Sequence, residues 1–351
     1  MDVNKEILKL DWEREPKGLY APIAYTLAAG GKRVRPQLAM IGSQLFGGKD
    51  EEVLPAALAL EVFHNFTLLH DDVMDKAEVR RGRPTVHIQW NENTAILSGD
   101  QMMIEAYTLL SKVPERALAR VLQLFNKMAT EICEGQQYDV DFEQKSDVTI
   151  EEYLMMIRLK TSVLLANALQ IGAYIAGASE EEQQAVYEFG INIGLAFQIQ
   201  DDILDVWGDP KTFGKAVGGD IACNKKTFVY LEAMRREGDE EMRRLGDEAM
   251  RRSGERAPQN ASVFGDPAEA KGERLEAREE LEDWYNQVLD DNKKKIARVK
   301  EIFEQLGVRE ACEQVVRDYT QRALDILETL PQNEASEELR KLAEKLLVRR
   351  V

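Results

Sequence analysis

The sequence predicts an all-α protein, and three observations support that prediction. No run of alternating Val, Ile or Thr bounded by turn residues has the length of a β-strand. All ten prolines lie outside residues 115–209, so this central stretch is able to form several uninterrupted helices. Apolar residues within it recur at helical spacing, as in Leu154, Ile157, Leu164 and Leu165. A helix bundle is therefore expected.

Composition narrows the functional classes. The chain has 351 residues, of which 44% are hydrophobic, so it is long and apolar enough for a substantial core. Its net charge of −17 argues against nucleic acid as a ligand and against a polybasic membrane face. Its three cysteines lie far apart in the sequence and form no CxxC pair, which favours a reducing compartment and a cytoplasmic location.

Neither a signal peptide nor a transmembrane segment is expected. The first 15 residues are charged throughout and contain no apolar core of a signal peptide. The most apolar window, Leu164–Ala178, has 15 residues and includes Asn167 and Gln170. A membrane span needs about 20 apolar residues, so this window is predicted to be a buried core helix.

The whole chain, residues 1–351, is expected to form one domain that carries a charged insertion at about residues 238–284. Within the insertion, "GDEEMRR" is followed by "GDEAMRR", and Pro258, Pro267 and several glycines would interrupt any long helix. We expect a solvated segment that is partly helix and partly loop. The sequence gives no role for the repeat.

Two aspartate motifs share one spacing. "DDVMD" begins at Asp71, "DDILD" begins at Asp201, and each follows a mostly apolar stretch. On a helix, residues four apart share a face, so Asp71 and Asp75 point the same way, as do Asp201 and Asp205. Partly buried carboxylates that repel one another are costly, and cations relieve that cost. A solvated acidic face is the alternative for either motif alone.

Oxygen ligands of this kind indicate a hard cation. Mg²⁺ binds one or two carboxylates and completes its shell with water and substrate phosphate. The sequence has no EF-hand loop for calcium, and neither His70 nor His87 has companions at zinc-ligand spacing.

Basic residues surround both motifs. "GGKRVRP" places Lys32, Arg33 and Arg35 directly after two glycines, and arginine binds phosphate with paired hydrogen bonds. Metal-binding acids together with scattered lysines and arginines suit a ligand that carries two diphosphates. Any one of these basic residues alone is better explained as a surface charge. The remaining basic residues near the two aspartate motifs are Arg80, Arg81, Lys160, Lys215, Lys225 and Lys226.

These motifs together resemble the trans-isoprenyl diphosphate synthases, the short-chain polyprenyl synthetases of the farnesyl and geranylgeranyl diphosphate synthase type. The resemblance covers about residues 30–230 and does not extend to the charged insertion. It rests on "GGKRVRP", "HNFTLLHDDVMD", "RRGRPT", "EGQQYD", "LKTS", "FQIQDDILD" and "GGDIACNKKT", which occur in the family's order.

The resemblance implies an antiparallel helix bundle around a deep central cavity, a homodimer, and two aspartate motifs that face each other. It implies a Mg²⁺-dependent enzyme that joins an allylic diphosphate to isopentenyl diphosphate. Two Mg²⁺ ions would bind Asp71 and Asp75 with support from Asp72, and a third would bind Asp201, with Asp202 and Asp205 behind it. The allylic diphosphate would contact Arg80, Lys160, Lys215 and Lys225. Isopentenyl diphosphate would contact Lys32, Arg35, His64 and Arg81. The catalytic residues at the reacting carbons would be Thr161 and Gln198, with Lys160.

Product length is expected to depend on the helix that carries Asp71. Phe66 and Thr67 lie five and four residues before Asp71, and a bulky residue there would block a growing chain. In the family this pattern goes with short products, here C20 (geranylgeranyl) or C15 (farnesyl). The alternative is that Phe66 packs between helices and that Met103 or Tyr107 sets the depth.

Rival functions remain at this stage. A class I terpene cyclase has related helices but no reason to keep "GGKRVRP" and a second DDxxD. A head-to-head condensing synthase would also lack that basic motif, and an HD-type phosphohydrolase needs more histidines than the three present. A non-catalytic partner subunit would be expected to have lost aspartates. Two arginines near the C-terminus, Arg349 and Arg350, suggest closure over the active site.

Overall fold

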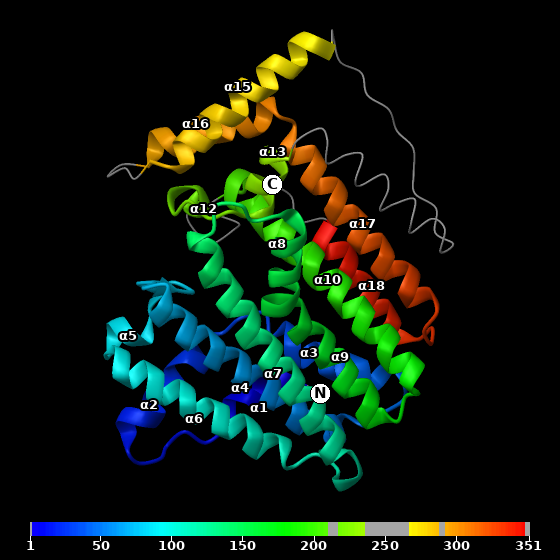
Figure 1. The fold of residues 1–351 in the computed structure, drawn as a ribbon. Helices are drawn as coiled ribbons and strands as arrows, with labels where there is room; N and C mark the ends of the chain where they lie inside the picture. Colours follow the sequence, from blue (N-terminus) through cyan, green and yellow to red (C-terminus); the bar gives the residue numbers. More distant parts are fainter. Residues whose placement is uncertain (1, 210–216, 236–266, 288–291, 348–351) are drawn as a thin grey trace. The chain divides into compact units, whose positions relative to one another are not determined.

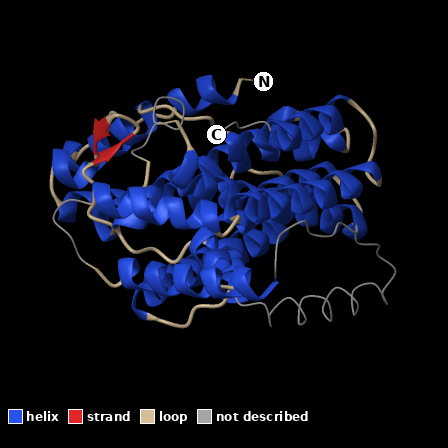
Figure 2. Ribbon diagram, turned by 90° about the horizontal axis from the view of Figure 1, so that it is seen from above, coloured by secondary structure: helices blue, strands red, loops and turns tan. Residues whose placement is uncertain are grey.

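A computed structural model describes residues 2–209, 217–235, 267–287 and 292–347. The all-α prediction is confirmed, since the described chain is almost entirely helical (Figures 1 and 2). The N-terminal helices are α1 (Val3–Leu8), α2 (Lys17–Ala28), α3 (Val34–Leu45), α4 (Asp50–Met74), α5 (Val86–Gln89) and α6 (Glu92–Leu110). The central helices are α7 (Glu115–Gln144), α8 (Ile150–Ile157), the π-helical turn η1 (Arg158–Ser162), α9 (Val163–Ala176) and α10 (Glu180–Trp207). The C-terminal helices are α12 (Gly219–Ala222), α13 (Phe228–Met234), α15 (Pro267–Tyr285), α16 (Lys293–Gln305), α17 (Val308–Glu328) and α18 (Glu334–Leu347).

The chain folds into two compact units, each built from segments that are distant in the sequence. Unit 1 comprises Met1–Tyr138, Met156–Phe197 and Arg317–Arg349. Unit 2 comprises Asp139–Met155, Gln198–Val316 and Arg350–Val351. Unit 1 carries the aspartate motif that begins at Asp71, and unit 2 carries the one that begins at Asp201.

Helix α4 is central to unit 1. Most of its residues between Val53 and Phe63 are buried, and it packs against α3, α6 and α9. Two glycines bring α3 and α9 into backbone contact. A Cβ on Gly42 would lie 2.4 Å from the Leu169 carbonyl oxygen, and one on Gly172 would lie 2.1 Å from the Ala39 carbonyl oxygen. Helix α4 packs against both α3 and α9, so this close packing stabilises the position of its aspartates.

One structural element was missed by the sequence prediction. Strands β1 (Val79–Arg80) and β2 (Arg83–Pro84) form an antiparallel hairpin directly after α4, drawn in red in Figure 2. Arg81 and Gly82 form its turn with φ of 52° and 72°. Positive φ at both central residues is typical of the two-residue hairpin turn. Strands of two residues are too short to give an alternating pattern, so the periodicity could not reveal them.

Unit 2 is organised partly by its C-terminal helices. Helix α16 packs against α12 and α15. At the end of α10, Trp207 donates a hydrogen bond from Nε1 to Glu304 at 2.8 Å and lies against Phe303. Of the charged insertion, residues 236–266, which hold the repeat, lie outside the described residues, while the described part belongs to helix α15.

Two helices are long and apolar enough to cross a membrane when judged only by length and composition. They are Asp50–Met74 and the continuous helix Ile150–Ala176. In both, most of the apolar window is buried inside the protein, at 61% and 67%. This burial is the behaviour of core helices, which the sequence predicted for the second one.

Candidate active site

The first aspartate motif lies at the C-terminal end of α4. Asp71 is half-buried in the last turn, Asp72 is buried, and Asp75 is the exposed C-cap residue. The pKa of Asp71 is raised to about 6, mainly because burial penalises its charge. The ammonium group of Lys160 opposes that shift, and the carboxylate of Asp75 adds to it. Asp71 therefore lies within the electrostatic reach of both residues.

This donor set fits Mg²⁺. The carboxylates of Asp71 and Asp75 repel each other, and a divalent cation would relieve both that repulsion and the desolvation of Asp71. Within the described residues, no group of three His, Cys, Asp or Glu side chains could hold a metal by itself. Mg²⁺ does not require such a group, because it usually takes one or two carboxylates and fills its shell with water and substrate phosphate.

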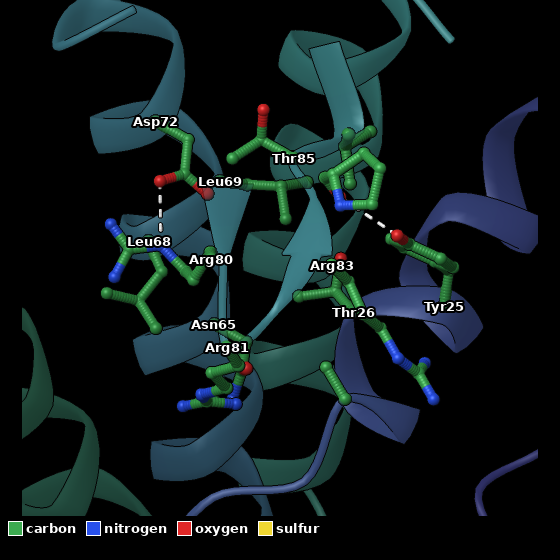
Figure 3. Close-up of a pocket in the computed structure, with 13 residues that line it drawn as sticks. Tyr25, Thr26, Asn65, Leu68, Leu69, Asp72, Arg80, Arg81, Arg83 and Thr85 are labelled. Carbon is green, nitrogen blue, oxygen red and sulfur yellow. Dashed lines mark hydrogen bonds and ion pairs between the residues drawn. The ribbon is translucent and has the colours of Figure 1, made fainter. Parts of the chain in front are cut away.

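Asp72 is turned toward the hairpin. Its Oδ1 accepts a hydrogen bond from Arg80 Nε at 2.7 Å, as Figure 3 shows. The same figure shows Tyr25 on α2 bonded to the other strand, through its hydroxyl to the Pro84 carbonyl at 2.9 Å. The hairpin is thus tied to α4 and α2. It carries both arginines that the sequence predicted as diphosphate ligands, Arg80 and Arg81.

Four arginines act electrostatically on one histidine. Burial lowers the pKa of His64 well below its usual value, and the guanidinium groups of Arg35, Arg81, Arg80 and Arg33 lower it further. His64 is therefore a neutral imidazole in the folded protein. Among the described residues, its Nδ1 and the Nε of Arg35 are buried and have no hydrogen-bond partner. Buried polar atoms of this kind are normally satisfied, so they point to an absent ligand or water.

The glycine pair brings its loop against Arg81. Gly30 and Gly31 have φ of 74° and 135°. Arg81 donates to the Gly30 carbonyl, and its guanidinium lies 3.0 Å from where a Cβ of Gly31 would be. The structure thus brings Arg35 and Arg81 close to His64, while Lys32 is exposed on the same loop.

The carboxylate that balances this cluster was not predicted from the sequence. Glu61 on α4 is buried and forms an ion pair with the buried Arg33, which also donates to the Leu27 carbonyl. Asn65, one turn further on, donates from Nδ2 to Glu61 Oε1 at 2.8 Å. A single acidic residue within the apolar run "LALEVF" was the available signal, because a charge in a core helix needs a partner.

Lys160 and Thr161 lie in the π-helical turn η1, between α8 and α9. Such turns are rare and occur often at functional sites. Helix α7 approaches this turn at Gly135, where a Cβ would lie 2.4 Å from the Lys160 amide nitrogen. Helix α10 approaches it at Gly194, where a Cβ would lie 2.5 Å from the Ser162 Cβ. The glycine of "EGQQYD" thus has a packing role beside a predicted catalytic residue.

In the second aspartate motif, which lies in unit 2, Asp202 and Asp205 are buried and Asp201 is half-buried. Asp202 is buried and accepts hydrogen bonds from Tyr153 OH at 2.6 Å, Phe228 N at 3.1 Å and Gln198 Nε2 at 3.2 Å. Burial raises the pKa of Asp202 to about 8, with a further contribution from Asp220. The predicted third-ion ligand, Asp201, is half-buried. Gln198, predicted at the reacting carbons, here has its amide on Asp202.

Asp205 connects this motif to the next. Its Oδ2 accepts from the Asp220 amide at 3.0 Å, and its carbonyl accepts from the Gly218 amide at 2.6 Å, at the start of α12. Lys225, a predicted diphosphate ligand, lies just after that helix. Two predicted features, Lys215 and the Arg349–Arg350 pair, lie outside the described residues.

The predicted floor residues lie on α4 below the motif. Phe66 packs edge-on against His70, with ring centroids 4.8 Å apart, and against Phe63 at 5.5 Å. Phe63 continues to Phe125 at 5.1 Å, and Phe125 to Tyr107 at 5.3 Å. Phe66 and Tyr107, which come from the two alternative explanations of product length, therefore lie in one row of contacting rings that runs from Tyr107 to His70. Thr67 donates its hydroxyl to the His64 carbonyl at 2.8 Å, within its own helix.

Residues 16–263 match the sequence model of the family "Polyprenyl synthetase". This chain belongs to the polyprenyl synthetase family. It is 36% identical to a short chain isoprenyl diphosphate synthase of Methanothermobacter thermautotrophicus over 339 residues, which cover 95% of this chain and 91% of that protein. It is 45% identical to a geranylgeranyl diphosphate synthase of Methanosarcina mazei over 224 residues, which cover 63% of this chain and 69% of that protein.

A solved structure agrees with these relatives. The crystal structure of a geranylgeranyl pyrophosphate synthase aligns with a TM-score of 0.83 and 41% identity, covering 99% of this chain and 96% of the other. Geranylfarnesyl diphosphate synthases also match this polyprenyl synthetase, at 40% identity. Relationship by itself therefore leaves the product length open.

Proposed function

We propose that this polyprenyl synthetase elongates an allylic diphosphate with isopentenyl diphosphate, head to tail, and stops mainly at C20, with C15 as the next candidate. It is a short-chain trans-prenyltransferase of isoprenoid biosynthesis. The observation that carries the proposal is the cluster in unit 1. There, neutral His64 and Arg35 keep unsatisfied buried nitrogens among four guanidiniums, close to the motif of Asp71 and Asp75.

Isopentenyl diphosphate is assigned to Lys32, Arg35, His64 and Arg81. The four arginines near His64 meet only two paired carboxylates among the described residues, Glu61 and Asp72. The excess positive charge suits a diphosphate, and guanidinium groups bind its oxygens in pairs. The neutral imidazole is available as a hydrogen-bond partner without adding a further charge.

The allylic diphosphate is assigned to Arg80, Lys160, Lys215 and Lys225. The carboxylates of Asp71 and Asp75 would hold two Mg²⁺ ions and Asp201 a third, and the bound ions would stabilise the departing diphosphate. Lys160 supports the same charge, because its ammonium already acts on Asp71. Arg80 is oriented by Asp72, so its guanidinium is held before substrate arrives.

The reaction then needs a dry environment for a carbocation. Breaking the allylic C–O bond leaves a cation, which the alkene of isopentenyl diphosphate attacks, and a proton then leaves to the released diphosphate. The hydroxyl of Thr161 and the amide of Gln198 would stabilise the cation through their dipoles. Thr161 lies in the π-helical turn, and the apolar helices around this turn would exclude water.

Product length is assigned to Phe66, with Thr67 beside it. Phe66 packs against Phe63 and His70, and these contacts would restrict the movement of its ring. A rigid ring five residues before Asp71 would stop a growing chain at about C20. Met103 and Tyr107 on α6 would come into contact with the chain only after Phe66 is removed.

Incorporation of radiolabelled isopentenyl diphosphate tests the activity. Purified protein with Mg²⁺ would be offered C5, C10 and C15 allylic primers, and products would be extracted and sized. Acid-labile C20 or C15 diphosphates are the expected result. Cyclic hydrocarbons would favour a terpene cyclase, and folded protein without incorporation from any primer would favour a non-catalytic partner subunit.

A homodimer in the cytoplasm is part of the proposal. Helix α6 exposes Leu97 and Ile104, each by 58%, together with Ile96 and Tyr107, which is the kind of apolar face that a second copy would cover. Cys133, Cys223 and Cys312 are free thiols, which suits a reducing compartment. Light scattering at a mass near twice 39.9 kDa is expected, and a mass of one chain at all concentrations would contradict the dimer.

A further inference from the structure

The turn that carries Lys225 depends on an asparagine in an unusual conformation. Helix α12 ends in a Schellman motif, in which the Asn224 amide donates to the Ile221 carbonyl at 3.2 Å and the Lys225 amide donates to the Asp220 carbonyl at 2.9 Å. Asn224 has φ of 57°, the left-handed conformation that this position requires. Glycine is the usual residue there, and asparagine has a steric cost that its side chain must offset.

The side chain of Asn224 is held by a buried lysine. Lys295, on α16, is fully buried, and its Nζ donates to Asn224 Oδ1 and to the Gln287 carbonyl, the latter at 3.1 Å. The ammonium also lies 5.6 Å from the ring centroid of Tyr285. One residue further along α16, Ile296 Cγ2 lies 2.6 Å from where a Cβ of Gly218 would be, at the other end of α12. Helix α16 therefore contacts α12 at both of its ends.

This arrangement is costly to the fold. Burial lowers the pKa of Lys295, which means that the surroundings disfavour its charge. Within the described residues, no carboxylate lies within 4.0 Å of the ammonium. Among the described residues, this buried cation is held by two oxygens and a ring, which is weak evidence for stability, because an apolar residue of similar size often serves the fold as well. The presence of a lysine at this position is better explained by its bond to Asn224, which fixes the geometry of the turn.

We propose that Lys295 is a positioning residue, which clamps Asn224 and so fixes the turn that presents Lys225 to the allylic diphosphate. The start of the same short helix is held by Asp205 of the second aspartate motif. Lys225 is thus placed by two anchors, Asp205 before α12 and Lys295 after it. The inference rests on the proposed role of Lys225 and adds a residue outside all of the motifs in the sequence.

The test uses the full-length enzyme with Mg²⁺ and four variants. Lys295→Met removes the ammonium at similar volume, and Asn224→Gly removes the clamped amide but tolerates the left-handed turn. Their double variant and Lys225→Ala complete the set, with exposed Lys294→Met on the same helix as the control. KM for a C10 or C15 allylic primer, KM for isopentenyl diphosphate and Tm are measured for each.

Lys295→Met and Asn224→Gly should each raise the allylic KM by about tenfold, the usual scale when a residue that orients a ligand-binding group is lost. Isopentenyl KM should stay unchanged, and the double variant should be no worse than the worse single variant, because both act through one contact. A change in Tm without a change in allylic KM would overturn the inference, as would additive effects. Should Lys295→Met fail to fold, Asn224→Gly decides by the same criterion.

Lys225→Ala separates the proposed role of Lys225 from that of Lys295. If it leaves the allylic KM unchanged, the proposed role of Lys225 is wrong and the inference falls with it. If it raises the allylic KM while Lys295→Met and Asn224→Gly do not, the role of Lys225 stands and the positioning role of Lys295 is wrong.

Discussion

Arg80 Nε donates to Asp72 Oδ1 at 2.7 Å, so the middle aspartate of "DDVMD" is bonded to a diphosphate-binding candidate on the hairpin. Asp71 and Asp75 remain as the pair suited to metal ions. The three aspartates of one motif are therefore expected to differ in function, although the sequence presents them as one set.

Substitution separates these roles. Asp71→Asn should raise the Mg²⁺ concentration needed for half-maximal rate and lower kcat by about 100-fold or more, because it removes a metal ligand. Asp72→Asn should leave the Mg²⁺ dependence almost unchanged and raise the allylic KM by about 3- to 10-fold, because Arg80 loses a charge-assisted hydrogen bond. Identical Mg²⁺ titration curves for the two variants would show that Asp72 is a metal ligand after all.

The buried pair of Arg33 and Glu61 should matter strongly for stability. Glu61→Gln leaves a buried guanidinium without its carboxylate and should lower the free energy of unfolding by about 3–5 kcal/mol in urea. The pair of Arg116 and Glu52 offers a matched control, because it joins the same groups but Arg116 is 59% exposed. Arg116→Gln should cost less than about 1 kcal/mol. Equal losses for the two variants would contradict this expectation.

Glycine substitutions test the approach of α7 to the π-helical turn. Gly135→Ala would place a Cβ 2.4 Å from the Lys160 amide nitrogen, and Gly172→Ala would place one 2.1 Å from the Ala39 carbonyl oxygen. Both should lower Tm, since each forces two backbones apart at a cost of about 1–3 kcal/mol. Only Gly135→Ala should also lower kcat, by about 10- to 100-fold, because it displaces Lys160 and Thr161. A similar fall in kcat for Gly172→Ala would mean that general destabilisation is responsible.

His64 should make the protein sensitive to acid. Its folded pKa lies well below its unfolded pKa, so below about pH 6.5 the unfolded chain binds a proton that folded His64 does not. Folding stability should then fall with decreasing pH, by up to about 1.4 kcal/mol per pH unit from this group. In His64→Gln the loss between pH 7 and pH 5 should be smaller by about 2 kcal/mol, measured by urea unfolding without substrate. Parallel stability curves for the two proteins would rule out a buried neutral imidazole.

The sequence was sufficient for the fold class, and it named several residues that the structure brings together in unit 1. Helical periodicity and the proline-free centre predicted the helices, and the family resemblance assigned Arg35, His64 and Arg81 to one ligand. The features it could not predict arise from contacts between distant residues. Glu61 pairs with Arg33, which lies 28 positions away in the sequence, and Lys295 bonds to Asn224, which lies 71 positions away. Local sequence patterns do not predict such long-range pairs. The hairpin and the π-helical turn are too short to show a periodic pattern of apolar residues.

The product of the wild-type enzyme, compared with that of Phe66→Ala, shows whether this chain is a short-chain synthase whose product length is set by Phe66. With Mg²⁺, a C5 primer and excess isopentenyl diphosphate, the wild type should release mainly C20 diphosphate, or C15 as the next candidate. Phe66→Ala should release longer chains, because the ring beside Phe63 is gone, whereas Val140→Ala, an exposed site on α7, should leave the length unchanged. Unchanged chain length in Phe66→Ala would show that Phe66 does not set the product length and would assign the floor to Met103 or Tyr107.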